Sequence, residues 1–321
     1  MALNIALIGT GGIVENGHAQ ALTELPSAQL WSVLSRDIAR AKEFAKQYNA
    51  TSPEPAYDSL DSLLSDPKLD AVIIATPDKL HKDQAIACAK AGKHILLEKP
   101  MATDTEGAQA IVNASEHAGI KLGICYHLRW HPAHMEVMQR VRAGELGELR
   151  HIRTLWAWKA ADDSNWRASP ELGRWWSLAG VGTHCLDLTR WLMIPDAGEV
   201  SGLKSTINQS VWNGPHDETA VVSLKFASGS TAEICSSVLF NAPSRLEVYG
   251  SDGFAICEGT FGRDGSGRAW TDNGAIDFKP QKPFVGLLDD FVRSITEDRK
   301  PSADAVEGAN NVRLLIESIS A

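Results

Sequence analysis

Residues 3–12 of the chain, LNIALIGTGG, decide its fold. Leu3–Ile8 form an apolar run that predicts a buried strand, and a stretch compatible with a helix follows the glycines. Gly9 permits a sharp bend, and Gly11 lets main-chain amides approach a pyrophosphate at a helix N-terminus. Val14 occupies the third glycine position of G-x-G-x-x-G, so by itself this could also be a tight turn that binds nothing.

A second apolar segment, Ala28–Leu34, closes a strand–helix–strand unit and ends at Ser35 and Arg36. In dinucleotide-binding folds an acidic residue at this point bonds the ribose hydroxyls of NAD. Here a hydroxyl and the guanidinium groups of Arg36 and Arg40 suit a 2′-phosphate, which arginine can bind with two parallel hydrogen bonds. We expect NADP(H) to be preferred. Asp37 keeps NAD(H) possible, and the two arginines could instead be solvated residues at a helix start.

Strand and helix patterns alternate with short connections up to residue 125, which predicts a doubly wound, mainly parallel sheet of an α/β Rossmann domain over residues 1–125. The remaining elements expected there are helices over 40–48, 59–65, 79–91 and 104–118, and strands over 70–75, 94–97 and 121–125.

From residue 126 the strands become longer and alternate in polarity, which predicts an α+β domain with a large, mostly antiparallel open sheet over residues 126–321. The elements expected there are helices over 132–143, 181–192, 286–296 and 303–318, and strands over 149–159, 200–211, 220–226, 230–240 and 245–249. The last two helices would cover the sheet or return to the first domain.

The segment His94–Ala102, HILLEKPMA, points to chemistry. Ile95–Leu97 predict a short buried strand, and Pro100 stops strand pairing just after it. Lys99 therefore stands at the carboxyl end of a strand, where ligands bind in open α/β sheets. We expect it to be a catalytic acid or base; the alternative is a structural ion pair with Glu98 or another carboxylate.

Composition excludes several classes of protein. A net charge of −9 argues against nucleic-acid binding. The five cysteines form no CxxC pair or metal spacing and are expected to be reduced thiols of a cytoplasmic protein. No apolar run approaches the length of a membrane span, and no signal peptide is apparent. We expect a metal-free site.

Four motifs occur in order along the whole chain: Gly9–Gly12, Ala75-Thr76-Pro77 with His81, Glu98-Lys99-Pro100, and Gly182–Asp187. Together they resemble the glucose-fructose oxidoreductase / inositol dehydrogenase / rhizopine catabolism (Gfo/Idh/MocA) family of NAD(P)-dependent oxidoreductases. The resemblance implies a Rossmann domain, a second domain with a large sheet, and a sugar, inositol or related carbonyl compound as substrate. It also implies that Lys99 and His184 lie beside the nicotinamide and the reacting carbon.

Tyr126–Arg129 and Trp166-Arg167 are further similar to a subgroup of this family, the NADPH-dependent bacterial 1,5-anhydro-D-fructose reductases. That similarity implies that Arg129, Trp166 and Arg167 lie near the cofactor.

The chain departs from the family at Gly180, where relatives usually carry an Asp four residues before the histidine. Asp187, on the same predicted helix face as His184, could supply a carboxylate instead. His184 itself could also be a helix residue satisfied by a main-chain carbonyl. Trp175 and Trp176 replace part of the usual glycine triplet and suggest a remodelled substrate pocket, although tryptophans also form cores and interfaces.

The expected catalytic residues are Lys99 and His184. The expected cofactor-binding residues are Gly9, Thr10, Gly11, Gly12, Ile13, Ser35, Arg36, Arg40, Ala75, Thr76, Pro77, His81, Glu98, Lys99, Arg129, Trp166 and Arg167. The expected substrate-binding residues are Lys99, His131, Trp166, Trp175, Trp176, His184 and Asp187.

Three hypotheses remain open at this stage. The leading one is an NADP(H)-preferring oxidoreductase of a sugar or polyol, and the second is an NAD-dependent inositol or aldose dehydrogenase. The third is a dinucleotide-binding sugar sensor without catalysis, which the missing Asp at position 180 mildly favours. A homodimer or homotetramer is expected through the open face of the second sheet.

Overall fold

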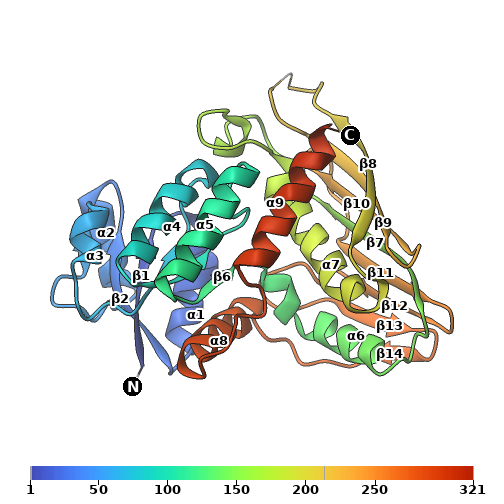
Figure 1. Cartoon of the computed structure of the whole chain (residues 1–321), viewed down its shortest axis with the longest axis horizontal. Coiled ribbons are helices and arrows are strands. Elements are labelled where there is room, and N and C mark those ends of the chain that lie inside the picture. The colour runs from blue at the N-terminus through green and yellow to red at the C-terminus, as the bar shows by residue number, and fades with distance from the viewer. Residues whose placement is uncertain (1, 213, 321) are drawn as a thin grey trace. The chain divides into compact units, whose positions relative to one another are not determined.

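The computed structural model describes residues 2–212 and 214–320 of the chain. It consists of two compact units (Figure 1). The first unit comprises residues 1–125 and 284–312, and the second comprises residues 126–283 and 313–321.

The first unit is built on a six-stranded parallel sheet in the order β3-β2-β1-β4-β5-β6. Its strands are β1 (Leu3–Ile8), β2 (Ala28–Leu34), β3 (Ala56–Tyr57), β4 (Ala71–Ile74), β5 (His94–Leu97) and β6 (Leu122–Ile124). β4 is buried along its whole length, as expected of a strand covered by helices on both faces. The order reverses between β1 and β4, and ligands of such sheets bind outside the carboxyl ends of the strands at this point.

Helical segments connect these strands, and α4 and α5 lie side by side (Figure 1). They are η1 (Val14–His18), α1 (Ala19–Glu24), α2 (Ile38–Gln47), α3 (Leu60–Leu64), η2 (Asp78–Leu80), α4 (His81–Lys90), α5 (Thr105–Ala118) and α8 (Pro283–Thr296). Side-chain caps begin several of them: Asp37 accepts hydrogen bonds at the start of α2 and Asp104 does so at the start of α5. The first half of α9 (Ala305–Ser320) belongs to the first unit and the second half to the second unit.

The second unit is built on an eight-stranded sheet in the order β14-β13-β12-β11-β7-β10-β9-β8. Its strands are β7 (Leu149–Ala157), β8 (Val200–Asn208), β9 (Thr219–Phe226), β10 (Thr231–Ser237), β11 (Arg245–Gly250), β12 (Phe254–Glu258), β13 (Arg268–Thr271) and β14 (Gly274–Ile276). Every pair is antiparallel except β7 with β10. The remaining helical segments are η3 (His127–Trp130), α6 (Pro132–Arg142), η4 (Trp166–Ala168), η5 (Leu178–Gly182) and α7 (Thr183–Ala197).

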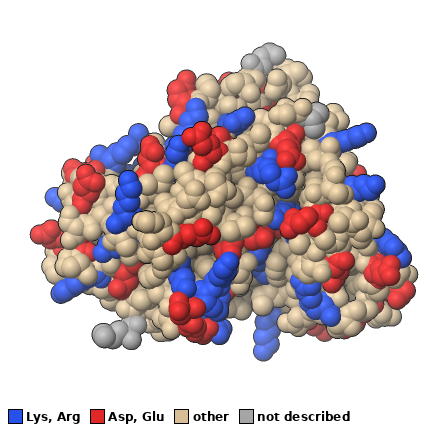
Figure 2. Space-filling view, viewed as in Figure 1, with Lys and Arg blue, Asp and Glu red and all other residues tan. Residues whose placement is uncertain are grey.

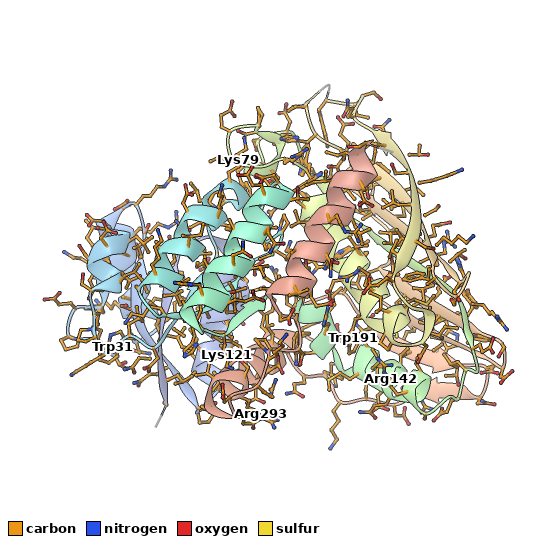
Figure 3. The ribbon with its side chains drawn as sticks, in the orientation of Figure 1. Trp31, Lys79, Lys121, Arg142, Trp191 and Arg293 are labelled. Atoms are coloured by element: carbon orange, nitrogen blue, oxygen red, sulfur yellow. The ribbon has the colours of Figure 1, made fainter. Side chains whose placement is uncertain are left out.

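Alternation along these strands gives the second sheet one buried and one open face. On β7, Ile152 and Thr154 are wholly buried, whereas Arg153 between them is exposed. The buried row packs with α7 in the core of this unit, and Trp191 of α7, labelled in Figure 3, packs against that core. The open face carries charged pairs such as Arg153 with Glu233, whose Nε and Oε1 atoms lie 3.1 Å apart.

The predicted fold class is confirmed: a doubly wound parallel sheet accompanies a large, mostly antiparallel sheet. The patterns did not predict β3, β12, β13 and β14, which have two to five residues each. Such short strands carry too few alternations to be recognised. The predicted 181–192 helix is longer in the structure, because α7 continues to Ala197 with Pro195 in its last turn.

Charged side chains of both signs are interspersed over the face seen in Figure 2. All five cysteines are free thiols. Among the residues that the structure describes, no helix combines the length and the apolar character needed to cross a membrane.

Candidate functional site

The glycine turn after β1 has the geometry that a pyrophosphate requires. Gly9 has a φ of +111°, and a Cβ there would lie 2.6 Å from the carbonyl oxygen of Ala75, which follows β4. Gly11 and Gly12 are exposed, with open space where a Cβ of Gly11 would stand, and Ile13 is the N-cap of η1. An exposed stretch of main chain thus lies at the carboxyl end of β1, where the strand order of the sheet reverses.

The carboxyl end of β2 meets this turn. The hydroxyl oxygens of Ser35 and Thr10 lie 3.5 Å apart, and Nη2 of Arg40 donates to the carbonyl oxygen of Thr10 over 2.6 Å. Arg36 is exposed. The Asp37 carboxylate is engaged at the start of α2, where Oδ1 accepts the amide hydrogens of Ala39 and Arg40. The Ser35 hydroxyl and the Arg40 guanidinium thus lie at the glycine turn, at the carboxyl end of β2.

His81 joins the segments that follow β4 and β5. Its ring is wholly buried, and its two nitrogens each lie 2.9 Å from a carbonyl oxygen, one of Thr76 and one of Pro100. Ala75, Thr76 and Pro77 are half-buried at this edge. His81 was expected to contact the cofactor. Its observed hydrogen bonds connect the segment after β4 with the segment after β5.

Lys99 is the second residue after β5 and is 7% exposed; Glu98, between it and the strand, is 6% exposed. Oε1 of Glu98 accepts a hydrogen bond from Nε2 of His18 over 2.8 Å. Oε2 of Glu98 accepts the main-chain amide hydrogen of Lys99 over 3.2 Å. The Glu98 carboxylate therefore anchors the main chain of Lys99.

His18, Glu98 and Cys125 are the only set of three potential metal ligands found within residues 2–212 and 214–320. Their ligand atoms lie within 4.8 Å of one another. The 2.8 Å contact between His18 and Glu98 is a hydrogen bond, so a proton occupies the space between these two atoms.

In the second unit, His184 of α7 is 4% exposed and lies in a cluster of rings. Its centroid is 4.7 Å from that of His127, 5.5 Å from that of Trp156 and 6.1 Å from that of Tyr126. The short η3 segment and β7 supply these neighbours. His127 lies beside His184 because η3 packs on α7.

Arg129 and Asp187, one turn after His184, form a buried bidentate ion pair. Asp187 was expected to contact substrate and Arg129 to contact cofactor; the structure shows each paired with the other. A Cβ at Gly180, four residues before His184, would meet nothing within 4 Å.

Asp217 is a buried residue that the sequence analysis did not assign to the site. Its carboxylate accepts hydrogen bonds from the Trp176 amide (2.9 Å), the Ser177 hydroxyl (2.6 Å) and the Leu178 amide (2.7 Å). Burial raises the pKa of Asp217 to about 6, although these three donors act in the opposite direction. Asp217 thus caps the helical segment that continues into α7 and His184.

Two of the expected tryptophans meet in a pocket of about 330 Å³ within the second unit. Trp166 and Trp176 line it together with Trp212, whose ring centroid is 4.9 Å from that of Trp176. The guanidinium of Arg167 lies 4.0 Å from the centre of the Trp166 ring. Polar lining is provided by Asp163, Ser164, Asn165, Ser169, His216 and Glu218. The sequence did not single out Trp212, which comes from the loop after β8.

Two other expected substrate residues lie elsewhere. Trp175 is wholly buried in the core of the second unit. His131 is also wholly buried: Nδ1 accepts the Ala133 amide hydrogen at the start of α6, and Nε2 donates to the Ser266 carbonyl oxygen over 3.0 Å. Burial lowers the pKa of His131 to about 4. These placements favour structural roles for both residues.

Comparison with known proteins agrees with this architecture. Residues 3–126 match the model of an oxidoreductase family with an NAD-binding Rossmann fold, and residues 134–256 match the GFO/IDH/MocA C-terminal domain. A D-xylose 1-dehydrogenase (NADP(+)) of Haloferax volcanii is 27% identical, with 96% of this chain and 94% of that protein covered.

A 1,5-anhydro-D-fructose reductase of Ensifer adhaerens is 28% identical over 78% of this chain and 76% of its own length. The crystal structure of the aldose-aldose oxidoreductase from Caulobacter crescentus shares the fold, with a TM-score of 0.92, 24% identity and coverage of 100% of this chain and 97% of that one. The chain therefore belongs to the Gfo/Idh/MocA family of oxidoreductases.

Proposed function

We propose that this oxidoreductase transfers a hydride between a nicotinamide dinucleotide and a CH–OH or C=O carbon of a sugar or polyol. The position of Lys99 carries the proposal. Lys99 follows β5, which pairs with β4, and β4 pairs with the β1 strand that leads into the glycine turn. A proton-transferring group is thereby held at the same sheet edge as a turn suited to a pyrophosphate.

The bound dinucleotide would supply or accept the hydride at its nicotinamide ring. Lys99 takes the hydroxyl proton when the substrate is oxidised and returns it when the carbonyl is reduced. His184 assists by hydrogen bonding to the reacting oxygen or by exchanging its proton. The ring cluster of Tyr126, His127 and Trp156 supports this role, because it fixes the orientation of the His184 imidazole.

A sugar or polyol is supported by the pocket of Trp166, Trp176 and Trp212. Apolar C–H faces of a sugar ring pack on indole rings, while the polar lining residues bond hydroxyl groups. The names of the two relatives above, a xylose dehydrogenase and an anhydrofructose reductase, point to the same class of compound.

NADP(H) is the proposed preferred cofactor, with NAD(H) as a possible alternative. Arg40 and Ser35 lie at the glycine turn, and Asp37 has its Oδ1 engaged by two amides of α2. A 2′-phosphate would complement the guanidinium groups of Arg36 and Arg40. A strong preference for NADH would overturn this argument and favour an inositol or aldose dehydrogenase that uses NAD.

We further propose a homodimer or homotetramer formed through the open face of the second sheet, working in the cytoplasm. Partly exposed apolar side chains on that face, Leu155 and Val221, support the contact, while Arg153 and Glu233 would give it charge complementarity. Light scattering coupled to gel filtration tests it: a monomer at micromolar concentration would contradict it.

The central experiment measures turnover of a panel of sugars and polyols with each cofactor. Replacing Lys99 by Ala should lower kcat by about 10²–10⁴-fold, as expected for loss of a general acid–base group. Lys121→Ala is the matched control. Lys121, labelled in Figure 3, directly precedes β6 and pairs with the exposed Asp298, so this substitution should leave kcat unchanged. A Lys99→Ala enzyme with normal kcat would refute the assignment.

The sensor without catalysis is the second candidate, favoured by the unfilled space at Gly180. Tight NADPH binding with no turnover on any compound of the panel would support it instead of the enzyme.

A further inference from the structure

We propose that His18 is a positioning residue that acts through Glu98 to place Lys99 for proton transfer. This inference rests on the proposed function of Lys99. His18 is buried and lies 80 residues from Glu98 in the sequence. It belongs to η1, the helical segment that follows the glycine turn.

The geometry of His18 is that of a fixed donor. The residue is 2% exposed at the end of η1, and the ring of Phe284 packs edge-on against it with centroids 5.0 Å apart. Its Nε2 atom lies 2.8 Å from Oε1 of Glu98. A carboxylate only accepts hydrogen bonds, so Nε2 carries the hydrogen and donates it.

Glu98 has further donors on its other side. Its Oε2 accepts the amide hydrogen of Lys99, and the Cys125 thiol is hydrogen-bonded to the same carboxylate. Burial, and then the charge of Glu98, raise the pKa of the Cys125 thiol well above its ordinary range, so the sulfur keeps its proton. The carboxylate is thus surrounded by donors from three separate segments of the first unit.

Burying a carboxylate costs free energy. The hydrogen bonds from these donors offset that cost only when the Glu98 carboxylate is in this one position. Because Oε2 holds the amide of the next residue, this position also fixes where the Lys99 side chain begins. Loss of the His18 donor would release Oε1, let the Glu98 side chain turn and loosen the main chain at Lys99. A shift of about 1 Å in a reacting group can lower a rate by about 10²-fold.

A metal ion is the competing use of these three residues, and it is less well supported. A zinc ion would have to displace the hydrogen that joins Nε2 of His18 to Oε1 of Glu98 over 2.8 Å. Stoichiometric zinc in the purified protein, lost together with activity on chelation, would overturn the positioning role.

The kinetic experiment compares His18→Ala with His18→Gln. His18→Ala should lower kcat by about 10–100-fold with the Kd for NADPH changed by less than about 3-fold, since Lys99 is displaced but the glycine turn is intact. His18→Gln, whose amide can still donate to Glu98, should restore kcat to within about 5-fold of the wild type. A His18→Ala enzyme with normal kcat, or one whose defect lies only in NADPH binding, would refute the proposal.

Cys125→Ala and Cys88→Ala form a matched pair of controls, because both remove a wholly buried thiol from the first unit. Only Cys125 contacts the Glu98 carboxylate, so Cys125→Ala should lower kcat measurably while Cys88→Ala leaves it unchanged. Equal effects of the two variants would mean that packing alone is responsible.

A readout that needs no turnover separates this proposal from the proposed function. With ¹⁵N-lysine labelling, the amide resonance of Lys99, assigned by its absence in Lys99→Arg, should shift in His18→Ala and return towards its wild-type position in His18→Gln. An unchanged Lys99 resonance would refute the positioning role even in an active enzyme. A shifted resonance in a protein without turnover would uphold the geometry and refute only the proposed function.

Discussion

Arg129 and Asp187 form a bidentate ion pair inside the second unit: Nε lies 2.8 Å from Oδ2 and Nη2 lies 2.6 Å from Oδ1. The Arg129 side chain is 4% exposed and that of Asp187 is 1% exposed. Since Asp187 follows His184 by one helical turn, the pair ties η3 to the face of α7 that carries the imidazole. The expectation from the sequence was that Arg129 lies near the cofactor, by resemblance, and that Asp187 contacts substrate.

The first prediction concerns this pair. Asp187→Asn should lower the free energy of unfolding by about 3–5 kcal/mol, because it leaves the Arg129 charge buried without its counterion. The double variant Arg129→Met/Asp187→Leu should recover most of that loss, since no charge remains uncompensated. Urea denaturation of the three proteins is the measurement. An Asp187→Asn cost below about 1 kcal/mol would show that the pair is not buried in solution.

The second prediction separates the two glycines of the turn. Gly9→Ala should lower the free energy of unfolding by more than about 1 kcal/mol, because a Cβ at a φ of +111° would lie 2.6 Å from the Ala75 oxygen. Gly11→Ala should leave stability within about 0.5 kcal/mol but weaken NADPH binding, since its Cβ would stand in open space beside the exposed main chain. Thermal unfolding and fluorescence titration with NADPH measure the two effects. Normal NADPH affinity in Gly11→Ala would contradict the placement of the pyrophosphate.

The third prediction follows from the raised pKa of Asp217, about 6 in the folded protein against an ordinary value of 3.8. The folded state binds this proton more tightly than the unfolded state. Stability from Asp217 therefore increases as the pH falls through 6 and levels off below 3.8. Between pH 7 and pH 5 the wild type should gain about 1 kcal/mol relative to Asp217→Asn. Urea denaturation at the two pH values tests this, and a difference independent of pH would refute it.

The fourth prediction has the opposite sign and concerns His131, whose pKa is about 4 in the folded protein against an ordinary value of 6.5. The unfolded state binds this proton more tightly, so stability is lost as the pH falls through 6.5 and levels off below 4. From pH 7 to pH 5 the wild type should lose about 2 kcal/mol relative to His131→Asn, which keeps a helix-capping side chain at the start of α6. Parallel slopes of the two proteins in this interval would contradict a buried neutral imidazole.

Local sequence patterns predicted the features that lie just after the ends of individual strands. Strand β5 has the predicted bounds, 94–97, and Lys99 follows it because Glu, Lys and Pro cannot continue a buried strand. Gly9 has the positive φ that a tight turn after β1 requires. Such features depend on neighbours in the sequence.

Contacts between residues far apart in the sequence could not be predicted from local patterns. Trp175 and Trp176 are adjacent, yet the first is in the core and the second lines a pocket with Trp212. The hydrogen-bond donors to the Asp217 carboxylate are likewise distant in the sequence; one of them, Ser177, is 40 residues away. Residue type alone did not distinguish these environments.

The sequence by itself determined the two-part architecture, the glycine turn and the place of Lys99 after β5, because periodicity and turn chemistry act over a few residues. Only the tertiary structure decided which side chain each buried charged group contacts: Asp187 pairs with Arg129, and Glu98 pairs with His18. The physical reason is that a buried polar group takes whichever partner the packing of distant segments brings within hydrogen-bond distance.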